Sequence, residues 1–84
     1  MYRITWLSRA VKQLGKLPVR DNQTVRRAVD KLSVFPQVPG VKKLASHEYS
    51  YRLRVGRYRV LFDADKEICI ITIQEVKKRD DRTY

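Results

Sequence analysis

Three arginines at strand-like spacing are the residues of this sequence best suited to hold a phosphate group. Arg52 and Arg54 precede the pair Gly56-Arg57, and Arg59 follows it. A guanidinium group donates two parallel hydrogen bonds to a phosphate and stabilises a pentacovalent phosphorane without any proton transfer of its own. These arginines are therefore candidates for binding a phosphate group.

The segment that carries the arginines predicts a β-hairpin. Residues 51–55 and 58–62 alternate apolar and polar side chains, as half-buried strands do. Gly56-Arg57 suits a two-residue turn with a positive φ at the glycine, and this turn places Arg54 opposite Arg59 and Arg52 opposite Leu61. The other face of the hairpin is then wholly apolar, with Tyr51, Leu53, Val55, Tyr58, Val60 and Phe62.

The pairing of Arg54 with Arg59 has two interpretations. Like charges directly opposite each other on a sheet are destabilising, by ~1 kcal/mol or less. One interpretation is that an anion belongs between the two arginines and offsets this cost. The other, equally good for a single pair, is a solvated basic face on an amphipathic hairpin.

More cations and an aromatic residue follow the last predicted strand. Lys78 and Arg79 end that strand, and Tyr84 comes five residues later. If the strand pairs beside residues 58–62, these cations lie near the basic face of the hairpin, and a tyrosine stacked on a nucleobase is worth ~1–3 kcal/mol. Such groups suffice to cleave RNA by attack of its own 2′-hydroxyl, although a solvated basic tail is the alternative interpretation of residues 77–82.

The charge of the chain predicts a polyanionic partner. The 84 residues include 19 Lys plus Arg and 9 Asp plus Glu, which gives a formal net charge of +10. This balance favours nucleic acid or an acidic protein as the partner. No apolar stretch approaches the ~18 residues of a membrane span, and no signal peptide is evident, so we expect a cytoplasmic protein without membrane contact.

Metal-dependent and histidine-dependent catalysis are not expected. The sequence has one histidine, His47, and one cysteine, Cys69. A mechanism with two histidines is therefore impossible, and no cluster of ligands has the spacing of a metal site. We expect His47 at the surface, Cys69 buried in an apolar strand, and neither a metal nor a small-molecule cofactor.

The elements that must position these residues follow the order β-α-α-β-β-β. Residues 2–6 alternate as a first strand, Ser8 is the predicted N-cap of a helix that ends before Pro18, and a second helix runs to about Val34. Residues 41–48 are expected to form a loop or an irregular edge, and residues 68–73 a central strand. The pattern predicts one α+β domain over residues 1–84, a twisted antiparallel sheet with two N-terminal helices packed on its apolar face.

A longer motif surrounds the arginines. It consists of Leu44, the stretch YRLRVGRYRVLF from Tyr51 to Phe62, an isoleucine-rich strand, and Val76 to Arg79 ahead of a tyrosine. This motif resembles the RelE/ParE superfamily of bacterial toxins, and the two helices match it by pattern and length. The resemblance covers essentially the whole chain and implies a RelE-like fold and a toxin that is paired with a protein antitoxin.

The resemblance also implies roles for individual residues. Arg59 falls where RelE-like toxins place an arginine on the scissile phosphate, Arg79 falls on the arginine credited with stabilising or protonating the leaving group, and Tyr84 resembles the tyrosine that orients the substrate. Arg52 and Arg54 stand where RelE has lysines, and an arginine is effectively never deprotonated, so the base would be Tyr84, Lys78 or water. The expected catalytic residues are Arg59, Arg79, Tyr84, Arg54 and Lys78, and the expected RNA-binding residues are Arg52, Arg57, Lys42, Lys43 and Lys77.

Three functions remain compatible with this resemblance. The first is a ribosome-dependent, metal-independent mRNA endonuclease, with mRNA, the ribosome and a cognate acidic antitoxin as partners. The second is a ParE-like gyrase inhibitor without nuclease activity, and the third is an inactive basic RNA-binding module. The presence of Arg59, Arg79 and Tyr84 together favours the endonuclease.

Overall fold

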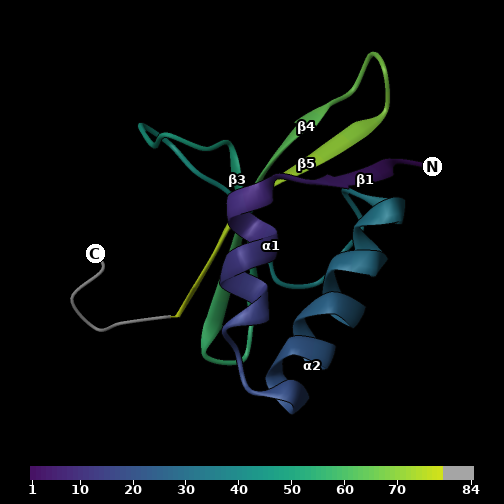
Figure 1. Ribbon diagram of the computed structural model, residues 1–84. Coiled ribbons are helices and arrows are strands. Elements are labelled where there is room, and N and C mark those ends of the chain that lie inside the picture. Colours follow the sequence, from purple (N-terminus) through teal and green to yellow (C-terminus); the bar gives the residue numbers. More distant parts are fainter. Residues whose placement is uncertain (79–84) are drawn as a thin grey trace.

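The computed structural model describes residues 1–78, which form two α-helices, one 3₁₀ helix and five strands (Figure 1). The helices are α1 (Ser8–Gly15) and α2 (Val19–Asp30), and α2 continues directly into the 3₁₀ helix η1 (Lys31–Val34). The strands are β1 (Arg3–Trp6), β2 (Val41–Lys43), β3 (Tyr51–Val55), β4 (Tyr58–Asp65) and β5 (Ile70–Lys78). Within this part of the chain, no helix is long and apolar enough to cross a membrane.

The strands form one sheet in the order β1-β5-β4-β3-β2. The expected antiparallel pairing is confirmed for strands β2 to β5. It is wrong for β1, which runs parallel to β5, so the sheet is mixed. After β1 the chain passes through the helices and re-enters the sheet at the opposite edge as β2, and three antiparallel steps then return it to β1. An alternating pattern identifies a strand, but it does not reveal the direction of the neighbouring strand.

The predicted β3–β4 hairpin is confirmed in its register. Arg54 pairs with Arg59, and Arg52 pairs with Leu61. Gly56 has φ +56°, a left-handed conformation that glycine adopts without the steric cost of a side chain. Strand β5 lies beside β4, as the expected convergence of basic residues requires.

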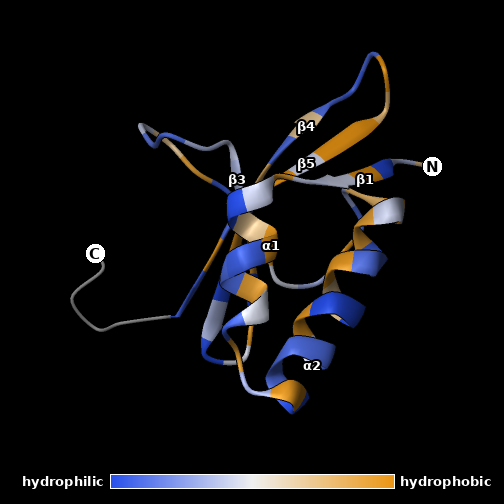
Figure 2. Cartoon of the chain, viewed as in Figure 1, coloured by the Kyte–Doolittle hydropathy of each residue, from blue (hydrophilic) through white to orange (hydrophobic). Residues whose placement is uncertain are grey.

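Both helices pack on one face of the sheet, which we call the inner face. Figure 2 shows the hydrophobic sides of α1 and α2 turned toward each other and toward the strands, with hydrophilic residues on their outer sides. The largest fully buried side chains are Phe62, Leu32, Ile71, Ile73, Val25, Val29 and Val60. A hydrogen bond of 2.6 Å from the Tyr58 hydroxyl to Asp21 Oδ2 also ties the hairpin to α2.

Local differences from the expected elements arise at helix and strand ends. Leu7, not Ser8, is the N-cap residue of α1, and no side chain caps this helix. The second helix tightens to 3₁₀ geometry after Asp30, and part of the expected loop at residues 41–48 is strand β2. The ends of helices and strands depend on tertiary hydrogen bonds, which residue propensity does not predict. The hydrogen bond from Arg54 N to Gly40 O beside β2 is an example.

Cys69 is exposed, so the expectation that it is buried is wrong. It lies in the turn between β4 and β5 with φ 54°, and the neighbouring Ile68 is 63% exposed. The turn is organised by Asp65, whose Oδ1 accepts hydrogen bonds from the backbone N–H groups of Glu67 and Ile68. This local structure delays the start of β5 until Ile70.

Candidate nucleic-acid interface

The face of the sheet opposite the helices, which we call the outer face, carries a row of three cations. Arg54 on β3 pairs with Arg59 on β4, and Arg59 pairs in turn with Lys77 on β5. Directly opposed residues of antiparallel strands project from the same side of the sheet, with Cβ atoms about 5 Å apart. These three residues, the cation row, therefore offer three positive groups to a single strand of phosphates.

Exposure differs sharply along the cation row. Arg54 is exposed and the Lys77 side chain is 51% exposed, whereas Arg59 at the centre is only 7% exposed. Burial lowers the effective dielectric around a charge and strengthens its interaction with an anion that reaches it. Arg59 is thus the residue of the row that would act most strongly on a bound phosphate.

A second row of side chains lies beside the cation row on the outer face. It runs from Lys42 on β2 through Arg52 on β3 and Leu61 on β4 to Glu75 on β5. Arg52 Nη1 donates a hydrogen bond of 2.8 Å to Gly40 O, so this guanidinium also holds the chain that enters β2. The second row is cationic only at its β2 and β3 end.

The remaining candidate residues are dispersed. By register, Lys43 lies opposite Tyr51 and Lys78 lies opposite Tyr58, which places both lysines on the inner-face side, away from the cation row. Arg57 is exposed in the β3–β4 turn. The structure therefore brings Lys77, and not Lys78, to the basic face.

A β-bulge explains this exchange between the two lysines. Leu61 pairs with Glu75 while Phe62 pairs with Ile73, so Gln74 is an extra residue in β5. One extra residue reverses the alternation of faces in the residues that follow it. Arg79 and Tyr84, the other two expected catalytic residues, lie outside the described residues.

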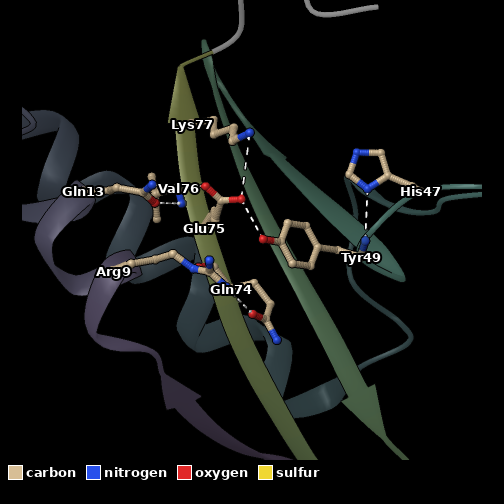
Figure 3. Close-up of polar contacts among 8 residues, drawn as sticks. All are labelled: Arg9, Gln13, His47, Tyr49, Gln74, Glu75, Val76 and Lys77. Carbon is tan, nitrogen blue, oxygen red and sulfur yellow. Dashed lines mark hydrogen bonds and ion pairs between the residues drawn. The ribbon is translucent and has the colours of Figure 1, made fainter.

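Glu75 joins the outer face to helix α1 and to the loop before β3 (Figure 3). Its Oε2 accepts a hydrogen bond of 2.7 Å from the Tyr49 hydroxyl and lies 3.8 Å from Lys77 Nζ. Its Oε1 accepts a hydrogen bond of 3.2 Å from Gln13 Nε2. The carboxylate thus links helix α1, the loop before β3 and the cation row.

The hydrogen bonds shift two pKa values in opposite directions. Burial alone raises the pKa of Glu75, but hydrogen bonds from Tyr49 and Gln13, with the charges of Lys77 and Arg9, lower it below its ordinary value of 4.5. The hydrogen bond to Glu75, together with burial, raises the pKa of Tyr49 from its ordinary value of 10.0 to about 12. At neutral pH the pair is therefore a carboxylate and a neutral phenol.

Helix α1 completes one edge of β5. Strand β1 pairs with β5 only as far as Ile73. Beyond that point Arg9 Nε donates to Gln74 O at 3.2 Å, and Gln13 Oε1 accepts from Val76 N at 2.7 Å. These side chains satisfy backbone groups of β5 that have no neighbouring strand to pair with, and so they tie the second half of β5 to helix α1.

The loop at residues 44–50 covers part of the outer face. Tyr49 and Leu61 are both 5% exposed, although neither belongs to the inner-face core. The Ser50 backbone N–H donates a hydrogen bond of 2.8 Å to Asp63 Oδ1, which fastens the loop to β4. His47 accepts a hydrogen bond from Tyr49 N at 3.1 Å through Nδ1 and is exposed, as expected.

The roles of Tyr49, Glu75 and Gln13 were not found from the sequence. Gln13 reads as one more polar helix residue, and Tyr49 falls in a segment expected to be a loop. One signal was available for Glu75, because the apolar residues Ile71, Ile73 and Val76 break the period of two at that point. A break of this kind indicates a bulge and a change of face.

The chemistry available at this interface is charge stabilisation at phosphate. Within residues 1–78 no group of His, Cys, Asp or Glu side chains is arranged to hold a metal ion. The cation row needs no metal to bind a phosphodiester, because guanidinium and ammonium groups donate hydrogen bonds to phosphate oxygens directly.

The fold has close structural relatives. The toxin–antitoxin complex RelBE2 from Mycobacterium tuberculosis matches with 30% identity and a TM-score of 0.80, over 93% of this chain and 98% of that chain. The archaeal RelE–RelB complex from Pyrococcus horikoshii OT3 matches with 30% identity and a TM-score of 0.80, over 95% and 97% of the two chains. The isolated RelE toxin from E. coli, at 18% identity and a TM-score of 0.79 over 99% and 89%, shares the fold.

Searches against protein-family models and against curated proteins gave no match. The assignment therefore depends on structure together with identity over nearly the full length of both chains. It agrees with the motif around Tyr51 to Phe62 and with the observed register of that hairpin. On these grounds the chain belongs to the RelE family of toxins.

Proposed function

We propose that this protein is the toxin of a type II toxin–antitoxin system and acts in the cytoplasm as a ribosome-dependent mRNA endonuclease. The observation that carries the proposal is the cation row, in which a nearly buried arginine, Arg59, stands between Arg54 and Lys77 on three adjacent strands. A solvated basic face does not require burial of its central cation. A phosphate-binding centre benefits from such burial, since the attraction between a cation and a phosphate is stronger where water is excluded.

The proposed reaction uses the RNA's own nucleophile. The 2′-oxygen attacks the adjacent phosphorus, the bond from phosphorus to the 5′-oxygen breaks, and the products are a 2′,3′-cyclic phosphate and a 5′-hydroxyl. The 2′-hydroxyl loses one proton and the leaving oxygen gains one. Arg59 and Arg54 stabilise the negative charge that builds up on the phosphorane oxygens.

The proton acceptor is assigned to Tyr84 or to water. Arginines do not deprotonate, and Lys78 lies on the inner-face side by register. Glu75 is a weak base, because both of its oxygens accept hydrogen bonds and its pKa is lowered. Proton donation to the leaving oxygen is assigned to Arg79, as the resemblance to RelE implies.

The proposed physiological partner is a cognate antitoxin with an acidic segment. Two of the structural relatives described above are complexes of RelE with RelB. A protein with a net charge of +10 attracts an acidic chain over long distances. We propose that the acidic segment covers the cation row and so prevents contact with RNA.

Mapping of mRNA ends tests the endonuclease proposal. After brief expression, primer extension should reveal new 5′ ends inside translated regions, and these ends should disappear when an inhibitor blocks the ribosomal decoding site. The upstream fragments should carry a 2′,3′-cyclic phosphate. Expression of an Arg59→Ala variant at the same level is the control for cellular nucleases.

A gyrase assay tests the main alternative function. A ParE-like protein would inhibit DNA supercoiling by purified gyrase and produce no new mRNA ends. That result, or cleavage that persists unchanged in the Arg59→Ala variant, would overturn the proposed function.

A further inference from the structure

A carboxylate, Glu75, is in contact with the cation row. Glu75 Oε2 lies 3.8 Å from Lys77 Nζ, and the two side chains are 16% and 51% exposed. The separation is within the range of an ion pair. On a protein with a net charge of +10, a carboxylate beside the proposed phosphate site weakens anion binding and calls for an explanation.

The carboxylate is fixed from two directions. Gln13 holds Oε1 and is itself anchored, because its Oε1 accepts the Val76 backbone N–H at 2.7 Å. Tyr49 holds Oε2 from the side of the loop at 2.7 Å. Figure 3 shows Gln13 and Tyr49 reaching Glu75 from opposite sides, with Lys77 directed at the same carboxylate. The counter-ion of the half-exposed Lys77 side chain is therefore held by two hydrogen bonds.

We propose that Glu75 is a positioning residue of the cleavage reaction: it holds the Lys77 ammonium at the end of the cation row. This inference rests on the proposed function and adds to it a residue that touches neither the RNA nor the reacting atoms. A lysine side chain has large rotamer freedom, and a fixed counter-ion restricts it before the substrate arrives. Tyr49 and Gln13 act one step further away, by fixing Glu75.

Glu75→Gln should change RNA binding and RNA cleavage in opposite directions. Loss of a negative charge beside the row strengthens the attraction for RNA, whereas loss of the counter-ion releases Lys77 from the geometry that the transition state needs. Binding should therefore improve while the chemical step slows. A residue that served only stability would not separate these two effects.

The first experiment measures both quantities. Affinity is measured with a 2′-O-methyl RNA oligonucleotide, which lacks the nucleophile, and cleavage is measured in single turnover on ribosome–mRNA complexes. Glu75→Gln should bind the oligonucleotide about two- to fivefold more tightly and cleave about tenfold more slowly. Glu67→Gln is the matched control, because Glu67 is an exposed carboxylate in the distant β4–β5 turn.

A double-mutant cycle then asks whether Glu75 acts through Lys77. If it does, Glu75→Gln should slow cleavage in the wild-type background and have no further effect in a Lys77→Ala background. Tyr49→Phe should slow cleavage less than Glu75→Gln does, because the counter-ion itself remains. Multiplicative losses for Glu75→Gln and Lys77→Ala, or wild-type cleavage by Glu75→Gln, would overturn the proposal.

A third measurement is independent of activity. NMR relaxation of the Lys77 side chain should report greater mobility in Glu75→Gln than in the wild type, and no change in Glu67→Gln. Equal mobility in all three proteins would refute the positioning role even if cleavage were affected. A wild-type protein that cleaves no mRNA would overturn the proposed function, and the NMR comparison would still decide whether Glu75 fixes Lys77.

Discussion

The two faces of the β-sheet are stabilised in different ways. On the inner face, apolar side chains from all five strands pack together with the two helices, and residues such as Phe62 and Ile73 have no exposure at all. On the outer face, the loop at residues 44–50 is held by a few directed contacts, such as the one from Tyr49 to Glu75. Burial of apolar area is non-directional and tolerates exchange, whereas each outer-face contact needs a particular pair of groups.

The neighbours Leu61 and Phe62 make this difference measurable. They are adjacent on β4 and face opposite sides of the sheet, with exposures of 5% and 0%. Phe62 also lies against two aromatic rings, Phe35 at 5.8 Å and Tyr51 at 5.5 Å between ring centroids. Leu61 is covered on the outer face without joining the main core.

The largest expected effect is therefore a loss of stability when a side chain of the inner face is removed. Phe62→Ala should lower the free energy of unfolding by ~3–5 kcal/mol, since it removes a ring from a closed core that cannot collapse into the space. Leu61→Ala should cost only about 2 kcal/mol, at the low end for a buried leucine. Urea denaturation of both variants measures the difference. Equal losses would mean that the outer face also has a closed core.

The next largest effect is a loss of cleavage activity when a cation of the outer face is removed. Arg59→Ala should reduce the cleavage rate by about 10²–10³, the loss expected for one charged donor to the transition state. Removal of one member of a like-charged pair also relieves repulsion with Arg54, so we expect the variant to remain folded.

The control for this variant is Arg27→Ala. Arg27 is exposed on α2 and its loss changes the net charge equally, on the side of the molecule away from the cation row. Arg27→Ala should retain most of the activity. A loss of similar size in both variants would show that overall charge, and not the cation row, governs cleavage.

The difference between the two faces also explains which parts of the fold could be predicted from the sequence. The β3–β4 hairpin was predictable to the residue, because alternation identifies both strands and Gly56 identifies the turn that sets their register. The inner face follows from the same alternation. The direction of β1 was not predictable, since it depends on how the chain returns from the helices and not on local pattern.

The outer face was predictable only in part. The cations were evident from residue type, but Lys77 and Lys78 exchanged faces because the bulge at Gln74 adds a residue to β5. The link from Gln13 through Glu75 to Tyr49 joins residues 62 and 26 positions apart in the chain. Polar contacts at such separations leave no periodic signal, and only the folded structure brings them together.

The third prediction concerns the antitoxin and the charge of the outer face. Association of the purified toxin with its acidic antitoxin should slow by about 10- to 100-fold between low salt and 0.5 M salt, because exposed charges steer the encounter and salt screens them. Stopped-flow mixing measures the rate. An on-rate that is indifferent to salt would indicate capture through an apolar surface and would leave the cation row to RNA alone.

The smallest expected effect is the loss of one tyrosine hydrogen bond on the outer face. Tyr58 on the inner face and Tyr49 on the outer face each donate a hydrogen bond to a carboxylate. Tyr49→Phe should lower the free energy of unfolding at pH 7 by about 1.5–3 kcal/mol, the usual contribution of a hydrogen bond to a charged group. The loss is smaller than that of Phe62→Ala because the ring remains in place.

The pH dependence of this loss identifies its cause. The pKa of Tyr49 is raised from 10.0 to about 12, so in the folded protein it keeps its proton at pH values at which the unfolded chain has lost it. The contribution of Tyr49 is therefore complete below pH 10 and is lost as the pH rises toward 12. In denaturation experiments across this range, the wild type should lose its advantage over Tyr49→Phe. A constant difference between the two proteins would show that the hydroxyl contributes through packing, without a hydrogen bond to the Glu75 carboxylate.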